Sequence, residues 1–141
     1  MTEPQSARVL LVEDDDRLRA TLRDLLTDTG FDVVGEARNG HEGVEMLDRG
    51  PDVVLMDLRM PVMGGLEAAR LIKEQDAFVQ VVILTAYEDP ALKEGAADGG
   101  VYAYLVKGCP PKMVGDVAQQ AFEMKRSLEE NPDLTGGPPG R

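Results

Sequence analysis

The chain has 141 residues, of which 43% are hydrophobic, and a formal net charge of -11 at pH 7. This length and composition favour one domain with a real core, because single domains commonly run to about 100–200 residues. The negative charge argues against direct binding of nucleic acid or an anionic membrane, which clustered Lys and Arg would hold, and no apolar stretch approaches the roughly 20 residues of a membrane span.

Short apolar runs alternate with helical patterns along the chain. Five such runs predict strands, at residues 9–12, 32–37, 53–56, 81–84 and 102–106. Strands that alternate with helices are typical of βαβ units and a parallel sheet. The sequence therefore predicts an α/β fold.

The helices between these strands differ in strength. The first has leucines at helical spacing and stops at Gly30, with Asp15 or Asp16 as its cap. The second, at about residues 40–47, is weakened by Gly43, and the third presents Leu66, Ala69 and Ile72 on one face.

The last two helices are predicted to contrast most. The fourth, at about residues 90–97, has few large apolar residues, so we expect it to be mobile. The fifth, at about 111–130, is the strongest, and its predicted buried stripe consists of Val114, Val117, Ala121, Met124 and Leu128. Residues 1–7 are predicted to be a flexible N-terminus, residues 8–130 the folded domain, and residues 131–141 a disordered Pro/Gly-rich tail or a truncated linker.

Polar residues follow four of the five predicted strands. Glu13 and Asp14 follow the first, Asp57 the third, Thr85 the fourth and Lys107 the fifth. The carboxyl ends of parallel strands meet at one edge of the sheet, where open α/β folds bind their ligands. We therefore expect these five side chains to lie together.

Carboxylates that lie this close repel one another unless a cation neutralises them. Mg²⁺ suits Glu13, Asp14 and Asp57, because it takes one or two carboxylates together with waters and phosphate oxygens. A carboxylate can also attack phosphorus and form an acyl phosphate, and Asp57 is the best placed to do so. Lys107 and Thr85 would then contact the phosphoryl oxygens.

Several segments in order resemble the receiver domain of two-component response regulators, over about residues 8–128. The matching segments are Leu11-Val12-Glu13-Asp14-Asp15, Met56-Asp57-Leu58-Arg59-Met60-Pro61, Gly64-Gly65, Leu84-Thr85-Ala86 and Tyr104-Leu105-Val106-Lys107. The resemblance implies a flavodoxin-like, doubly wound five-stranded parallel sheet of order 2-1-3-4-5 with helices on both faces.

The same resemblance implies roles for individual residues. Asp57 would be the phosphoacceptor, and Glu13 and Asp14 would hold Mg²⁺ with Asp57 and the backbone carbonyl of Arg59. Thr85 and Lys107 would contact the phosphoryl group. Tyr104 would fill the space left when Thr85 moves, and so switch the surface of helix four, strand five and helix five.

A protein of this kind is a signalling phosphoacceptor and not an enzyme with turnover on a foreign substrate. Its expected partners are a histidine kinase or phosphotransfer protein and a second copy of itself, bound through helix four, strand five and helix five. The single cysteine, Cys109, excludes an internal disulfide and favours a reducing cytoplasm.

Two positions depart from the family pattern. Gly108 follows Lys107 where a proline in a cis bond is usual, so a cis bond is not expected there. Glu13 replaces the commoner aspartate and lengthens the reach to the metal by one methylene.

Three alternative functions fit the sequence less well. A hydrolytic phosphatase would usually carry a second aspartate two residues after its nucleophile, where this chain has Arg59. An interaction domain without phosphorylation would not need the intact set of five polar residues. A flavin carrier would need a Gly- or hydroxyl-rich phosphate loop where this chain has four consecutive acidic residues, at 13–16.

Overall fold

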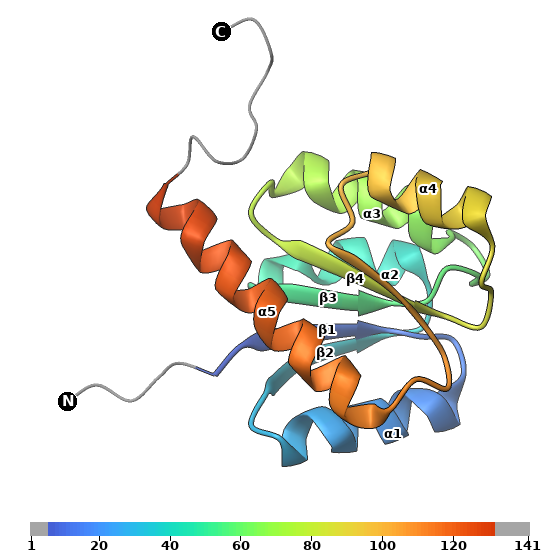
Figure 1. Ribbon diagram of the computed structural model, residues 1–141, viewed down its shortest axis with the longest axis horizontal. Coiled ribbons are helices and arrows are strands. Elements are labelled where there is room, and N and C mark those ends of the chain that lie inside the picture. Colours follow the sequence, from blue (N-terminus) through green and yellow to red (C-terminus); the bar gives the residue numbers. More distant parts are fainter. Residues whose placement is uncertain (1–5, 132–141) are drawn as a thin grey trace, which may run out of the picture.

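The computed structural model describes residues 6–131, which form one five-stranded parallel sheet with helices on both faces (Figure 1). The strand order is β2-β1-β3-β4-β5, so the predicted fold class and strand order are confirmed. The strands are β1 (Arg8–Val12), β2 (Asp32–Ala37), β3 (Val53–Met56), β4 (Gln80–Thr85) and β5 (Ala103–Val106). The helices are α1 (Asp16–Asp28), α2 (Gly40–Glu45), the short 3-10 helix η1 (Met46–Arg49), α3 (Gly65–Gln75), α4 (Pro90–Asp98) and α5 (Pro111–Glu130).

The predicted terminal segments lie mostly outside the described residues, which leave out 1–5 and 132–141. Ala7, which we assigned to the flexible N-terminus, is buried in the core. Its carbonyl accepts a hydrogen bond from the N–H of Asp32 at 2.9 Å, which extends the contact between the first two strands.

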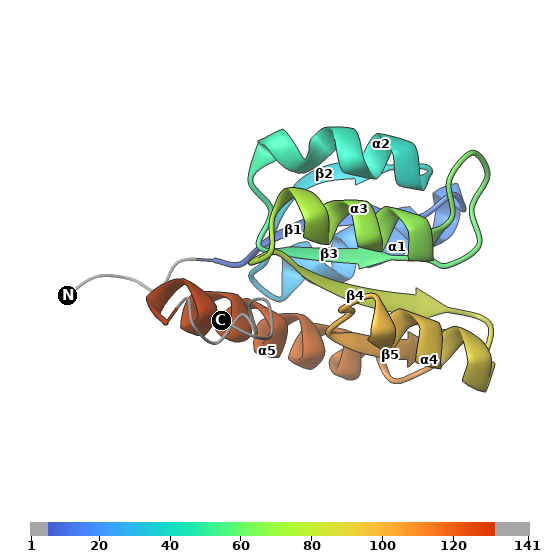
Figure 2. The same cartoon turned by 90° about the horizontal axis from the view of Figure 1, so that it is seen from above.

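The sheet separates two hydrophobic cores. Helices α1 and α5 cover one face, and α2, α3 and α4 cover the other (Figures 1 and 2). Because both faces of the central strands are covered, β1, β3 and β4 are buried at almost every residue. This explains why their sequences are continuous apolar runs without alternation.

Helix α1 begins where the acidic turn offers a cap. The carboxylate of Asp15 accepts hydrogen bonds from the N–H groups of Arg17 and Leu18 at 2.9 and 3.1 Å. These bonds lower the pKa of Asp15, because they favour its charged form. Asp15 therefore caps the helix, as expected, which leaves Glu13 and Asp14 free for the edge of the sheet.

Gly43, which weakens the predicted second helix, is needed for the packing of that helix against β1. A Cβ atom at Gly43 would lie 2.9 Å from Cγ2 of Val12, so α2 can approach β1 only without a side chain there. The predicted helix at 40–47 is also shorter than expected, since α2 ends at Glu45 and η1 continues from Met46.

The predicted stripe of α5 is wrong at one position. Met124 is exposed, with 40% of its surface accessible, whereas Ala118 and Phe122 are buried. Val114, Ala121 and Leu128 are buried as expected. The apolar residues of α5 recur every three or four positions on two neighbouring faces of the helix. The face that carries Phe122 packs against the sheet.

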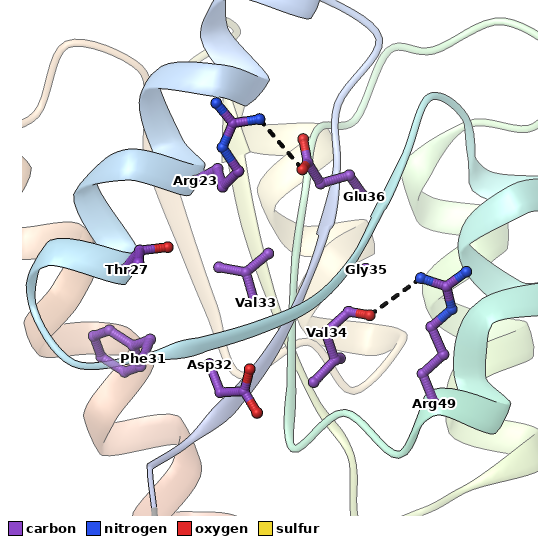
Figure 3. Close-up of a pocket in the computed structure, with 9 residues that line it drawn as sticks. All are labelled: Arg23, Thr27, Phe31, Asp32, Val33, Val34, Gly35, Glu36 and Arg49. Carbon is purple, nitrogen blue, oxygen red and sulfur yellow. Dashed lines mark hydrogen bonds and ion pairs between the residues drawn. The ribbon is translucent and has the colours of Figure 1, made fainter.

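Strand β2 is one outer edge of the sheet. The register with β1 shifts between Val9 and Leu10, which leaves Val34 as the extra residue of β2. Arg49 donates a hydrogen bond from Nη1 to the carbonyl of Val34 at 3.1 Å, beside a hollow along this edge (Figure 3). Within the described residues, no helix has the length and apolar character that crossing a bilayer requires.

Candidate functional site

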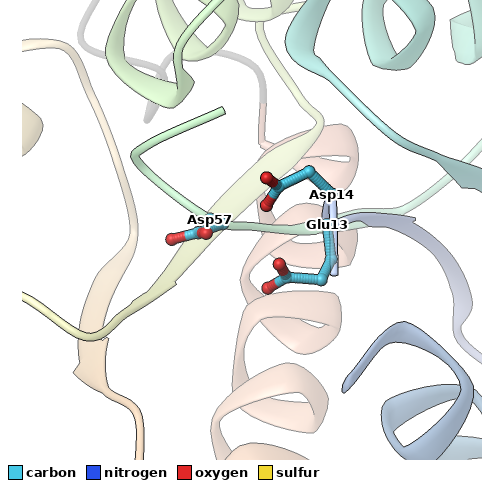
Figure 4. Close-up of side chains that lie close together, drawn as sticks. All are labelled: Glu13, Asp14 and Asp57. Atoms are coloured by element: carbon cyan, nitrogen blue, oxygen red, sulfur yellow. The ribbon is translucent and has the colours of Figure 1, made fainter. Parts of the chain in front are cut away.

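Three carboxylates meet at the carboxyl ends of β1 and β3. One oxygen of each of Glu13, Asp14 and Asp57 lies within 4.8 Å of the others (Figure 4). The N–H of Asp57 donates to the carbonyl of Val12 at 3.0 Å, so the two strand ends are tied together at the point where the acids begin. Three of the five side chains that we expected to meet at this edge, the carboxylates, therefore lie close together.

Glu13 is buried, and its carboxylate is held on both sides. Oε2 accepts a hydrogen bond from the N–H of Asp15 at 3.0 Å, and Oε1 lies 3.0 Å from Nζ of Lys107. Burial raises the pKa of Glu13, and the charge of Asp57 adds to the rise, while the hydrogen bonds from Asp15 and Lys107 oppose it. The raised pKa shows that the negative charge at Glu13 is not fully compensated.

Lys107 is the cation of the site. Its Nζ lies 3.0 Å from Glu13 and donates to Oδ2 of Asp57 at 3.2 Å, and its N–H donates to the carbonyl of Thr85 at 2.7 Å. Burial alone would lower the pKa of Lys107, but the two carboxylates outweigh it and raise the pKa. The bond to Gly108 is trans, as expected, and Gly108 has a φ of 98°, a conformation that glycine adopts readily.

Asp57 is held by the turn that follows it. Its Oδ1 accepts a hydrogen bond from the N–H of Leu58 at 2.7 Å, and the N–H of Gly65 donates to the carbonyl of Leu58 at 2.8 Å. A Cβ atom at Gly65 would lie only 2.3 Å from the carbonyl oxygen of Asp57. A side chain at that position would displace the backbone of Asp57, so the close approach of α3 depends on this glycine.

Thr85 and Tyr104 lie on neighbouring strands but do not share a hydrogen bond. Thr85 is fully buried, and its Oγ1 accepts from the N–H of Tyr87 at 3.3 Å. The hydroxyl of Tyr104 donates to the carbonyl of Tyr87, and the guanidinium of Arg59 stacks 4.0 Å from the centre of the Tyr87 ring. Tyr104 is therefore directed to the loop between β4 and α4.

The donor set fits a hard divalent cation. Carboxylate oxygens are the ligands that Mg²⁺ prefers, and histidine or cysteine is absent from the cluster. Three carboxylates with one lysine leave an excess of negative charge, which a divalent cation would neutralise. Asp14 is exposed, which leaves room for water and for phosphate oxygens in the remaining coordination positions.

One residue near the acids was missed by the sequence reading. Arg19, on α1, donates from Nη1 to the backbone carbonyl of Glu13 at 2.7 Å. Its place on the helix, three residues after Asp16, indicated only an ion pair along the helix surface. A bond from a side chain to a backbone carbonyl leaves no pattern in a sequence.

Comparisons with known proteins identify the family of this chain. The sequence profile of the response regulator receiver domain matches residues 9–119. The transcriptional regulatory protein PdtaR of Mycobacterium tuberculosis is 42% identical over 101 residues, which are 71% of this chain and 49% of PdtaR. The response regulator UvrY of Escherichia coli is 38% identical over 122 residues, which are 85% of this chain and 56% of UvrY.

A solved structure shares the whole fold. The signal receiver domain of an HD domain-containing protein from Pseudomonas fluorescens Pf-5 matches with a TM-score of 0.84 at 25% identity, over 93% of this chain and 97% of that domain. The chain thus spans about half the length of PdtaR and UvrY and nearly all of this receiver domain.

Proposed function

The chain belongs to the response regulator receiver domain family of two-component systems, and from this premise we propose that Asp57 accepts a phosphoryl group from a histidine kinase or phosphotransfer protein. The observation that carries the proposal is the position of Asp57 between a cation and two further carboxylates. Its Oδ2 accepts from Nζ of Lys107, and one oxygen lies within 4.8 Å of oxygens of both Glu13 and Asp14.

In the proposed reaction, a carboxylate oxygen of Asp57 attacks the phosphorus of a phosphohistidine. The new P–O bond forms as the P–N bond breaks, and the imidazole nitrogen of the donor keeps the electron pair. Asp57 needs no general base, because it reacts as a carboxylate. Lys107 would move from Glu13 and Asp57 to a phosphoryl oxygen, where a compact ammonium stabilises the transferred charge.

The metal of this reaction would be bound by Glu13, Asp14 and Asp57, together with the backbone carbonyl of Arg59. When bound, Mg²⁺ supplies charge neutralisation for the phosphoryl oxygens. The longer side chain of Glu13 fits here because it folds back onto the N–H of Asp15, which shortens its reach.

Hydrolysis by solvent would return the domain to its first state, so both chemical steps act on its own aspartate. Arg59 occupies the position of the second aspartate of hydrolytic phosphatases, and its guanidinium stacks on Tyr87. This arrangement supports a signalling role in place of turnover on a foreign substrate.

The output surface that we propose consists of α4, β5 and α5. A phosphoryl group adds about -1.5 to -2 charges, which would draw the Thr85 hydroxyl away from the N–H of Tyr87. Tyr104 would then give up its bond to the Tyr87 carbonyl and fill the space behind Thr85. Exposed Met113 and Met124 on α5 offer apolar area to a partner or a second copy.

The phosphoacceptor assignment is tested by incubation with acetyl phosphate and Mg²⁺, followed by intact mass. We expect the wild type to gain one phosphoryl group and Asp57→Asn to gain none. An equal gain in both, or a gain in neither, would overturn the assignment. Tyr104→Ala tests the output separately: we expect it to take up phosphoryl groups normally while losing phosphorylation-dependent dimerisation or partner binding.

A further inference from the structure

Arg19 reaches back from α1 to the acidic turn that precedes this helix. Its Nη1 donates to the carbonyl of Glu13 at 2.7 Å, and only 15% of its side chain is exposed. Arg19 has no role in the transfer of a phosphoryl group to Asp57 that is proposed above. Even so, this arginine holds a main-chain atom between two of the carboxylate residues.

The guanidinium of Arg19 is itself held from two directions. Nη2 donates to Asp16 at 2.7 Å within α1, and Nε lies 3.4 Å from Glu36 on β2. Glu36 also pairs with Arg23, whose Nη1 lies 3.5 Å from its second oxygen (Figure 3). Arg19 is thus fixed in one position by a helix and a strand, which lowers the entropy cost of its bond to Glu13.

This bond completes the fixation of the backbone of Glu13. The N–H of Glu13 donates to the carbonyl of Ala37, and the carbonyl of Glu13 accepts from Arg19. The first bond holds the peptide between Val12 and Glu13, and the bond from Arg19 orients the next peptide, between Glu13 and Asp14, from which the Asp14 side chain follows. The distance between the carboxylates of Glu13, Asp14 and Asp57 therefore depends on the bond from Arg19.

We infer that Arg19 is a positioning residue for the metal site: it orients the peptide between Glu13 and Asp14 so that their carboxylates converge with Asp57 on Mg²⁺. The inference rests on the proposed function. Charge alone predicts the opposite effect, because a cationic side chain close to the site repels Mg²⁺, and its removal would tighten metal binding. The sign of the change on removal of Arg19 therefore separates positioning from simple electrostatics.

The experiment is a calorimetric titration of the full chain with Mg²⁺, after removal of metal by a chelator. In Arg19→Met and in Arg19→Gln we expect Mg²⁺ binding to weaken about tenfold, the usual effect of losing an outer-shell partner. Arg19→Lys should recover part of the affinity, because an ammonium can still donate one hydrogen bond to the carbonyl of Glu13.

Arg23→Met is the matched control. Arg23 pairs with the same Glu36 and is a cation of the same helix, but its hydrogen bond goes to Asp24 and not to Glu13. We expect its Mg²⁺ affinity to stay within about twofold of the wild type, which is about 0.4 kcal/mol against about 1.4 kcal/mol for a tenfold change. Urea unfolding of each variant separates a loss of stability from a loss of metal affinity.

The possible outcomes are distinct. Equal or tighter Mg²⁺ binding by a folded Arg19→Met or Arg19→Gln variant would overturn the inference and leave the proposed function intact. Equal weakening in Arg23→Met would also overturn it, since the effect would then come from the shared contact with Glu36 and not from the bond to the carbonyl of Glu13. Absence of Mg²⁺ binding by the wild type would overturn both the proposed metal site and this inference.

Discussion

Single residues at the proposed phosphorylation site lower the stability of the fold while they prepare the site for a ligand. Glu13 is buried beside Asp57, and within residues 6–131 Lys107 is the one cation that pairs with both. The pKa of Glu13 is raised mainly by burial, so the charged form of this carboxylate lowers the stability of the fold. Sites that are prepared for a ligand often lower stability in this way until the ligand binds.

This cost predicts that Glu13→Gln stabilises the metal-free protein. The amide removes the repulsion with Asp57 and the cost of burying a charge, and its single oxygen keeps one of the two contacts of the carboxylate, with the N–H of Asp15 or with Lys107. We expect a gain of about 0.5–1 kcal/mol in the free energy of unfolding at neutral pH, the usual scale of a stabilising substitution. Urea unfolding in the presence of a chelator measures the gain.

The same variant should bind Mg²⁺ more weakly, because one anionic ligand is lost. A destabilised Glu13→Gln variant in chelator would contradict the view that the negative charge at Glu13 is uncompensated. Asp15→Asn is a useful comparison, since it also removes one negative charge from the turn but acts on the cap of α1.

At the scale of elements, packing decides whether replacing a helical glycine by alanine stabilises or destabilises the fold, as two glycines show. Gly43 on α2 faces Val12, and a Cβ atom there would lie 2.9 Å from Cγ2. Gly115 on α5 has open surroundings, and the nearest atom to a Cβ atom would be Cε2 of Phe31 at 3.9 Å. Helix propensity favours alanine at both positions.

We therefore expect opposite signs for Gly43→Ala and Gly115→Ala. Gly43→Ala should lower the free energy of unfolding by about 1–3 kcal/mol, because α2 must move away from β1. Gly115→Ala should raise it by about 0.5–1 kcal/mol. Urea unfolding of the two variants provides the measurement, and a gain in both would show that α2 can shift at little cost.

Helix α5 is joined to the far end of the sheet by a largely buried ion pair. Nζ of Lys125 donates to Oδ1 of Asp52 at 2.8 Å, and the other oxygen of Asp52 accepts from the N–H of Arg8 at 2.8 Å. Burial alone would lower the pKa of Lys125, but the hydrogen bonds and charges of Asp52 and Glu129 together outweigh it and raise the pKa. The charged form of Lys125 is thus favoured in the folded protein.

Lys125→Met should lower the free energy of unfolding by about 1–2 kcal/mol at neutral pH. A lysine with a raised pKa contributes its stability below its unfolded pKa, about 10.4, and loses it as the pH rises through the folded value. The deficit of the variant should therefore be constant between about pH 7 and 9.5 and shrink above about pH 10.5. Urea unfolding across this range is the measurement, and Lys112→Met, which affects only an exposed pair, should change stability much less.

At the scale of the whole molecule, a strongly negative protein concentrates three of its carboxylates at one edge of its sheet. Mg²⁺ should therefore stabilise the entire fold by mass action, by about 2.7 kcal/mol at a concentration one hundred times its Kd. Asp14→Ala should keep the stability of the metal-free protein, since Asp14 is exposed, and lose most of this gain. Thermal unfolding with Mg²⁺ and with chelator measures both, and an Asp14→Ala variant that still gained full stability would exclude Asp14 as a ligand.

Much of the architecture could be predicted because it depends on side-chain type and spacing. Continuous apolar runs mark buried parallel strands, and the polar residues after them, from Glu13 to Lys107, converge since parallel strands end at a common edge. Contacts made by main-chain atoms could not be predicted in this way. The bond from Arg19 to the carbonyl of Glu13 and the fit of Gly65 against the carbonyl of Asp57 depend on the path of the backbone. Met124 was misplaced because two adjacent faces of α5 share the same spacing of apolar residues.

The hydrogen bond from Arg49 to the carbonyl of Val34 has a consequence for assembly. An open edge strand is a template on which another chain can add a strand, and charged side chains with bulges are the usual protection. Here the extra residue Val34 interrupts the regular spacing of β2, and the guanidinium of Arg49 already bonds its carbonyl. Both features oppose the regular pairing of a further strand with β2, so we expect a self-associating form of this protein to join through its helices or through β5 and not to extend as a fibre along β2.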